Sequence, residues 1–291
     1  MRLAIISAKS GLFHPNKRLL EASKGSNVEA FLLHPKGLLT SQDRVISYRD
    51  RGLHLDVALI RIGATINPYA MAVVRAMESS GVRVISRPEA IELARHKFLS
   101  LSWLHKGGIR VPESYLVSNK KNLGCALRRL GGPPVVLKAT SGRQGEGVWL
   151  LNEISEMEEL IYDQQAHKSG IVAQEYIDGR EVENLRLFVV GGRVIGGLRF
   201  IPKRGEFRAN FHMGAKAFPV SPDKELESIA LKTSHILGLE IAGVDMVLSD
   251  GVPYVLEANY SPGFRAFEEV TGIDVAKCII EYIKESHGVR S

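Results

Sequence analysis

Three oxygen-bearing side chains near the end of the chain have the types and spacing of a magnesium site. Asp245 lies in one apolar, strand-like segment, 241–247, and Glu257 and Asn259 lie in the next, 253–259. Magnesium takes one or two carboxylates and completes its octahedron with water and phosphate oxygens. A set of carboxylate and amide oxygens suits magnesium better than it suits zinc or iron. The alternative is three unrelated polar residues at the ends of a surface hairpin.

The two segments must be paired in one particular register for this site to form. Successive side chains alternate between the faces of a strand, so Glu257 and Asn259 share a face. An odd loop, for instance Asp250-Gly251-Val252, places Asp245 opposite Glu257, whereas an even loop turns it to the other face. Three-residue hairpin loops with glycine are common, and we therefore expect the odd loop.

A second candidate is a lysine followed by a glycine-rich loop. Lys138 ends the apolar segment 134–137, and three glycines follow within six residues. Backbone N–H groups of such a loop could surround phosphates while the lysine supplies a point charge. The loop is neither a Walker loop nor a Rossmann fingerprint, because no helix follows it. An ordinary hairpin loop is the alternative. The residues concerned are Ser141, Gly142, Gly145 and Gly147.

Segment 171–177 reads as a strand that ends at Asp178-Gly179. A strand between two lobes can offer its backbone edge to an adenine ring, which would involve Gln174, Glu175 and Tyr176. A purely structural strand is the alternative.

These candidates must be positioned by two kinds of architecture. The first ninety residues alternate strand-like and helix-like segments, which predicts a parallel sheet with helices on its faces. Pro88 opens a helix that we expect to continue through Leu104 to Gly107-Gly108. The predicted strands are 3–7, 28–33, 56–61 and 82–85, and the helix between the last two is 69–79.

The rest of the chain reads as α+β. Two antiparallel pairs are predicted, 135–138 with 148–151 and 185–190 with 193–199, the second joined by Gly191-Gly192. Helices are expected at 222–237 and 274–285. The predicted fold is thus an α/β N-terminal lobe followed by two α+β lobes, with bounds 1–94, 95–176 and 177–291.

Composition excludes several classes of protein. The 291 residues are 45% hydrophobic and 24% charged, a globular balance. Two distant cysteines, Cys125 and Cys278, argue against a disulfide framework or a zinc site and fit the cytoplasm. No run resembles a signal peptide or a membrane span. The net charge of +6 is scattered, apart from a cluster at Arg199, Lys203, Arg204 and Arg208. Without an aromatic-interleaved basic stripe, nucleic-acid binding is not expected.

Taken in order, these motifs resemble the ATP-grasp superfamily over nearly the whole chain. The segment 261–274, with Ser261-Pro262-Gly263-Phe264, Glu268 and Thr271-Gly272-Ile273-Asp274, is similar to the RimK-type alpha-L-glutamate ligases. The other motifs that carry the resemblance are Lys97, Lys138, Gln174-Glu175-Tyr176-Ile177, Phe207-Arg208-Ala209-Asn210, Ala242-Gly243-Val244-Asp245 and Glu257-Ala258-Asn259.

The resemblance implies a role for each motif, with ATP held between the middle and C-terminal lobes. Lys97 and Lys138 would contact ATP phosphates, and the loop 141–147 would cover them. Glu175 and Tyr176, after Gln174, would form the adenine hinge. Arg208 and Asn210 would reach the phosphates and the reacting carboxylate, and Asp245, Glu257 and Asn259 would hold magnesium or manganese. The implied catalytic residues are Arg208 and Asn259.

The implied reaction activates a carboxylate as an acyl phosphate, which an amine then attacks. The implied partners are ATP, an amino acid such as glutamate and a carboxylate substrate on a cofactor, peptide or protein tail. Family members often form homo-oligomers. An ATP-grasp kinase acting on a hydroxyl, and a non-catalytic nucleotide-binding regulator, are the alternatives. No motif identifies the general base, although His212 lies near the site.

Three departures from the family pattern concern the substrate side. Asn184 stands where an aspartate is usual, so it can bond a ribose without bringing charge. Phe200-Ile201 replaces an arginine pair, and Met213-Gly214-Ala215 follows His212 where Arg-Gly-Gly is usual. The carboxylate substrate is therefore left open.

Overall fold

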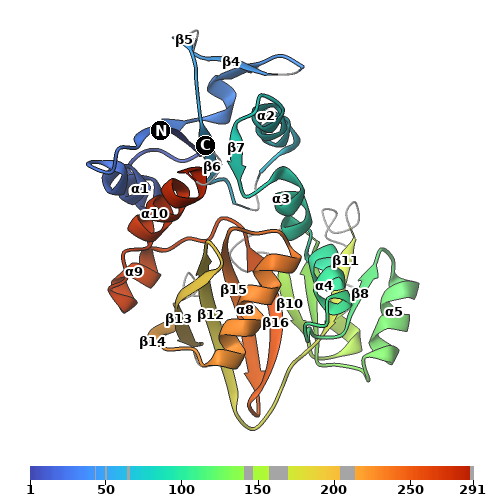
Figure 1. Ribbon diagram of the computed structural model, residues 1–291. Coiled ribbons are helices and arrows are strands. Elements are labelled where there is room, and N and C mark those ends of the chain that lie inside the picture. Colours follow the sequence, from blue (N-terminus) through green and yellow to red (C-terminus); the bar gives the residue numbers. More distant parts are fainter. Residues whose placement is uncertain are drawn as a thin grey trace.

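The computed structural model describes residues 1–291 except 43, 50, 64–65, 141–146, 157–169, 204–213 and 289–291. The described part forms an N-terminal parallel sheet, a central sheet, a C-terminal sheet and a small three-stranded sheet (Figure 1). Among the described residues, no helix combines the length and the apolar character that a membrane span requires.

The N-terminal sheet has the strand order β2-β1-β6-β7, and all its strands are parallel, as predicted. Its inner strands are buried on both faces, because helices cover a parallel sheet from both sides. Ala4 and Ile6 belong to one hydrophobic core, and Leu3 and Ile5 to the other. The elements are β1 (Arg2–Ile6), α1 (His14–Ser23), β2 (Glu29–Leu33), β6 (Val57–Ile60), α2 (Pro68–Ser79) and β7 (Arg83–Ile85).

The small sheet projects from this region at the top of Figure 1. It follows a short 3-10 turn, η1 (Pro35–Gly37), and consists of β3 (Leu38–Thr40), β4 (Val45–Tyr48) and β5 (Arg51–Gly52).

The single helix expected after Pro88 is wrong, because the structure divides it into α3 (Pro88–Arg95) and α4 (Lys97–Lys106). At His96 the backbone is extended, with φ −96° and ψ 101°. The His96 ring accepts a hydrogen bond from Leu99 N–H at 3.3 Å and so caps α4. The N–H of Lys97 donates to the Thr140 carbonyl of the central sheet region at 3.0 Å, outside any helix. The break therefore places Lys97 at the first position of α4.

The central sheet is antiparallel, with the order β10-β9-β11-β8. The predicted pairing of segments 135–138 and 148–151 is confirmed. Its strands and helix α5 enclose a separate core that includes Leu123, Leu127 and Leu137. The elements are β8 (Ser114–Val117), α5 (Lys120–Arg129), β9 (Val135–Ala139), β10 (Val148–Leu151), η2 (Ile154–Glu156) and β11 (Ile171–Glu175).

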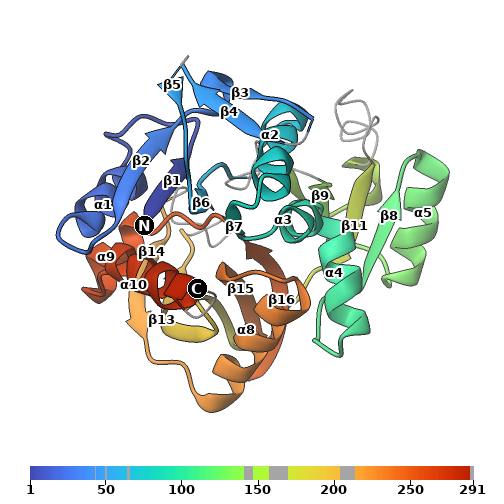
Figure 2. The same cartoon turned by 45° about the horizontal axis from the view of Figure 1, so that its top comes forward.

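The C-terminal sheet is also antiparallel, in the order β14-β13-β12-β15-β16. Gly191 and Gly192 have φ values of +58° and +74° and form the predicted tight turn between β12 and β13. Helix α8 packs on one face of this sheet (Figure 2). The elements are β12 (Val182–Val190), β13 (Arg193–Ile201), β14 (Lys216–Val220), α8 (Lys224–Ile236), β15 (Ile241–Ser249) and β16 (Val252–Asn259).

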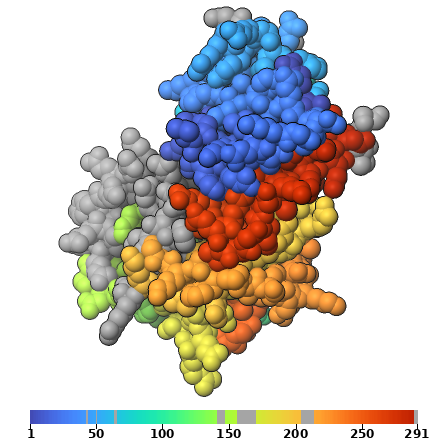
Figure 3. Space-filling model, turned by 90° about the vertical axis from the view of Figure 1, so that its left-hand side faces the viewer, coloured from blue at the N-terminus to red at the C-terminus, as the bar shows by residue number. Residues whose placement is uncertain are grey.

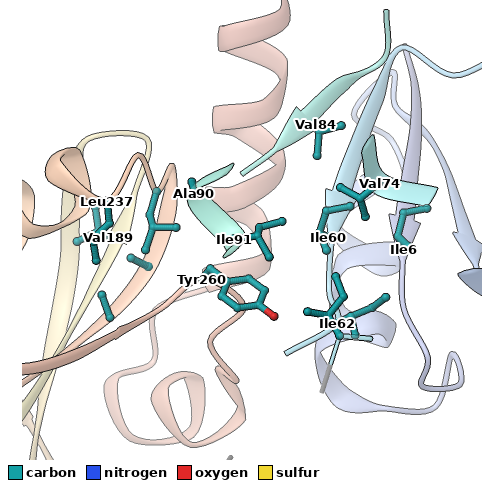
Figure 4. Packing of buried hydrophobic residues seen from close by; sticks show 14 of the residues in the cluster. Ile6, Ile60, Ile62, Val74, Val84, Ala90, Ile91, Val189, Leu237 and Tyr260 are labelled. Atoms are coloured by element: carbon teal, nitrogen blue, oxygen red, sulfur yellow. The ribbon is translucent and has the colours of Figure 1, made fainter. Parts of the chain in front are cut away.

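The end of the chain returns to the N-terminal sheet. Helices α9 (Arg265–Thr271) and α10 (Val275–Gly288) follow β16, and α10 packs on α1. The space-filling view shows these two ends of the chain in contact (Figure 3). In Figure 4 the ring of Tyr260, the residue after β16, lies beside Ile91, and its hydroxyl points toward Ile62. One hydrophobic core thus joins the exit of β16 to the end of β6.

Candidate active site

The β15–β16 hairpin is closed by two residues, so the expected odd loop is wrong. Ser249 pairs with Val252, and Asp250 and Gly251 between them have φ values of +48° and +80°. This is the two-residue turn that an Asp-Gly pair favours, because its twist matches that of the strands. In an unbroken ladder from this turn, Asp245 would face Leu256 and would lie on the opposite face from Glu257.

A β-bulge restores the register that the loop does not provide. Met246 pairs with Val255, but Asp245 pairs with Glu257, so Leu256 is the extra residue. The ladder continues with Gly243 opposite Asn259. Bulges redirect side chains and are over-represented beside active sites. The bulge brings Asp245, Glu257 and Asn259 to one face of the sheet.

The three side chains are in direct contact. Asn259 Nδ2 donates to Glu257 Oε1 at 3.1 Å and to Asp245 Oδ2 at 3.3 Å. Two carboxylates of like charge thus share one amide donor. A cation between them would relieve their repulsion, and the amide oxygen of Asn259 would be the third donor.

Arg186 is a member of the site that the sequence did not single out. It lies on β12 opposite Asp245. Its Nε and Nη2 donate to Asp245 Oδ1 and Oδ2 at 2.5 and 2.6 Å, a bidentate ion pair. Arg186 is two residues from Asn184 and therefore shares its face of β12. This alternation along β12 was the only signal in the sequence that pointed to Arg186. It does not reveal which strand lies beside β12.

The electrostatics of the two carboxylates differ. Burial raises the pKa of Asp245 to about 6, although the Arg186 guanidinium opposes this shift. Burial acts in the same direction on Glu257, but Lys97, Lys138 and Arg186 outweigh it and hold the pKa of Glu257 below its usual value. Glu257 is therefore the more readily ionised of the two carboxylates.

Two lysines, from β9 and α4, add positive charge beside the carboxylates. Lys138 lies on β9 and Lys97 begins α4, and burial lowers the pKa of Lys138 to about 8. With Arg186, three cationic side chains face two carboxylates. Such an arrangement can receive a polyanion together with a divalent cation, because the cationic side chains offset the polyanion and the carboxylates offset the cation.

The other predicted residues are placed as follows. Gly147 has φ +70°, and its carbonyl accepts the Ala139 N–H at 2.8 Å, which closes the loop at the base of β9–β10. Gln174 is buried and donates to Ser114 Oγ at 3.0 Å, and Glu175 accepts the Glu113 N–H at 3.0 Å. Half-buried Tyr176 follows β11, and half-buried Asn184 lies on β12. Ser141, Gly142, Gly145, Arg208 and Asn210 lie outside the described residues.

The donor set fits magnesium. In the described part of the chain, no group of three His, Cys, Asp or Glu side chains could hold a metal ion. Two carboxylates and one amide oxygen are hard donors, too few for a protein cage but sufficient for an ion that keeps water and phosphate ligands.

Comparison with known proteins agrees with this architecture. Residues 1–91 match the RimK PreATP-grasp domain family, and residues 94–283 match the RimK-like ATP-grasp domain family. A protein from Methanococcoides burtonii named "Probable alpha-L-glutamate ligase" is 35% identical over 290 residues, which cover 98% of this chain and 96% of that protein.

Two solved structures share the fold. The RimK domain protein ATP-grasp from Sphaerobacter thermophilus superimposes with a TM-score of 0.78 at 22% identity, covering 97% of this chain and 99% of the other. The ATP-grasp ligase PsnB, in a complex with Mg, ADP and a precursor variant, gives 0.73 at 16% identity, covering 97% of each chain. Both family matches together span most of the sequence, and the protein therefore belongs to the RimK-like ATP-grasp family.

Proposed function

We propose that the protein is an ATP- and magnesium-dependent ligase that forms an amide bond between a carboxylate and an amino acid, with L-glutamate as the amine. The observation that carries this proposal is the cluster of Asp245, Glu257 and Asn259 on one sheet face, with Lys97 and Lys138 close enough to Glu257 to lower its pKa. Family membership and the name of the M. burtonii relative support the reaction and the amino acid.

The proposed assignments follow the geometry where it is described. Asp245, Glu257 and Asn259 hold magnesium, which manganese can replace, and Lys97 and Lys138 bind ATP phosphates. The loop with Ser141, Gly142, Gly145 and Gly147 covers the phosphates, Gln174, Glu175 and Tyr176 form the adenine hinge, and Asn184 bonds the ribose. Arg208 and Asn210 reach the phosphates and the carboxylate. The three lobes are 1–94, 95–176 and 177–291, with ATP between the last two.

The described residues act mainly by position and charge. The bound metal would neutralise charge on the phosphoryl group during its transfer to the carboxylate. Arg186 keeps Asp245 ionised and oriented through two hydrogen bonds. Lys138 reaches the site from the central sheet, where burial strengthens its interaction with anions. A carboxylate oxygen attacks the terminal phosphorus and ADP leaves. The neutral amine then attacks the acyl carbon, phosphate leaves, and the nitrogen gives up one proton to solvent as the amide forms.

We also propose a cytoplasmic location, which fits the two free cysteines, Cys125 and Cys278. By analogy with the family, we propose a homo-oligomer.

An ADP-release screen tests the function. The protein is incubated with Mg²⁺, ATP and each amino acid in turn against candidate acids, including folate-like and deazaflavin cofactors and peptides. If the protein is a ligase, ADP and free phosphate should form only when the acid and L-glutamate are both present. Mass spectrometry should then detect the amide product. If the phosphate is instead retained on a hydroxyl substrate, the protein is a kinase and the ligase proposal is wrong. Glu257→Gln is the matched control and should lower ADP release at least about 10²-fold.

A further inference from the structure

Arg61 occupies a junction between the N-terminal sheet and the exit of β16. It directly follows β6, at the carboxyl edge of the parallel sheet where α/β folds bind ligands. Its Nη2 donates to the Pro262 carbonyl at 2.7 Å, and its guanidinium lies 5.5 Å from the centre of the Phe264 ring. Beside it, Tyr260 Oη donates to the Gly63 carbonyl at 2.6 Å.

The guanidinium of Arg61 is buried, with only 7% of the residue exposed. Among the described residues it has no ion pair with a carboxylate, and its Nε has no hydrogen-bond partner. Burial lowers the pKa of Arg61 to about 10, still well above neutral, so the side chain stays cationic. An unpaired buried charge is costly unless something compensates it.

Other unsatisfied polar atoms gather at the same edge. Within the described residues four buried side-chain atoms lack a hydrogen-bond partner, and three of them are Arg61 Nε, His14 Nδ1 and Asn16 Oδ1. His14 packs edge-on against Phe264, the ring on which Arg61 also lies. Asn16 donates to Ser7 Oγ at 3.1 Å, at the end of the neighbouring strand β1. The concentration of such atoms distinguishes this edge from an ordinary packed interface.

The edge is also next to the metal-site residues. A Cβ placed on Gly243 would lie 3.0 Å from Pro262 Cβ and 3.6 Å from Arg186 Cδ, so both side chains border the same glycine. Pro262, which Arg61 bonds, is three residues beyond Asn259. Among the described residues, and apart from the adjoining residues of the chain, no atom lies within 4 Å of a Cβ built on Gly63 or Gly263, so the space beside both glycines is open to this part of the chain.

We propose that Arg61 binds a carboxylate of an organic substrate and so anchors that substrate beside the metal site. The inference rests on the proposed ligase function. A guanidinium matches a carboxylate in charge and planar geometry, and a substrate carboxylate would supply the missing counter-charge. Two substrates of the proposed reaction carry this group, the acceptor acid and L-glutamate. The bound anion would pair with Arg61 while the reacting groups lie toward Arg186 and Asp245.

Steady-state kinetics of Arg61→Gln and Arg61→Lys test the proposal, using L-glutamate, ATP and the acceptor identified by the ADP-release screen. We expect Arg61→Gln to raise the KM of one carboxylate substrate at least tenfold and to leave the KM of ATP within twofold. Arg61→Lys retains the charge and should recover part of that loss. The substrate whose KM rises identifies the source of the carboxylate.

Tyr260→Phe is the control for a purely structural role, because it removes the neighbouring hydrogen bond to Gly63 without changing charge. We expect this variant to keep the KM of both carboxylate substrates within twofold. The proposal is overturned if Tyr260→Phe reproduces the Arg61→Gln effect, if the KM of ATP rises by the same factor, or if neither carboxylate KM changes. A wild-type protein that releases no ADP with any acid and amine would instead refute the proposed function.

Discussion

Removing the charge of each site carboxylate should have a different main effect. Asp245→Asn should mainly lower stability, and Glu257→Gln should mainly weaken metal binding. Both oxygens of Asp245 are engaged by Arg186, at 2.5 and 2.6 Å, whereas the described hydrogen bond to Glu257 comes from the Asn259 amide at 3.1 Å. Asp245→Asn therefore leaves a largely buried guanidinium without its counter-ion. Removing one partner of a buried pair costs about 3–5 kcal/mol, and we expect roughly 2–4 kcal/mol here because the side chains of Arg186 and Asp245 are still 26% and 19% exposed.

Glu257→Gln should instead act mainly on the metal. Glu257 has the freer oxygens, so it is the principal proposed ligand, and its loss should raise the half-saturating Mg²⁺ concentration more than Asp245→Asn does. Turnover should fall at least 10²-fold, which corresponds to about 2.7 kcal/mol of transition-state stabilisation.

Urea unfolding gives the stability of each variant, and ADP release at varied Mg²⁺ gives the metal requirement. Arg186→Met combined with Asp245→Asn closes a double-mutant cycle on the ion pair. The reasoning is refuted if Asp245→Asn unfolds at the same urea concentration as the wild type. It is equally refuted if Glu257→Gln retains the wild-type Mg²⁺ dependence.

Three further outcomes are expected. The affinity of the protein for ATP, measured by calorimetry, should fall up to about tenfold per pH unit above pH 8 as Lys138 loses its proton, and Lys138→Arg, which stays charged, should remove this decline. Gly191→Ala should lower the unfolding free energy by about 1–3 kcal/mol more than Gly192→Ala does. A Cβ on Gly191 would lie 2.1 Å from the Tyr282 ring, whereas the space beside Gly192 is open. Equal melting temperatures of the two variants would contradict this. Asp223→Ala should cost about 1 kcal/mol in urea unfolding, since its carboxylate caps α8 with a 2.8 Å hydrogen bond.

Local pattern was sufficient for much of the architecture. The buried parallel strands of the N-terminal sheet, the Gly191-Gly192 turn and the antiparallel pairing of β9 with β10 follow from apolar runs and turn residues. The break at His96 did not follow, because it depends on a hydrogen bond from Lys97 N–H to Thr140, which is distant in sequence.

The candidate site divides in the same way. Alternation along one strand determined that Glu257 and Asn259 share a face, since that periodicity is a property of the strand itself. Whether Asp245 joins them was decided only by the bulge at Leu256, which reverses the parity set by the Asp250-Gly251 turn.

Arg186 and Arg61 show the limit of sequence most clearly. Arg186 belongs to the site because β12 lies beside β15 and brings it to Asp245, 59 residues away. Arg61 meets Pro262 across 201 residues. The sequence by itself indicated candidate side chains for binding metal and phosphate. The tertiary structure alone decided which charges face one another, because strand order and register depend on packing between segments that local periodicity does not encode.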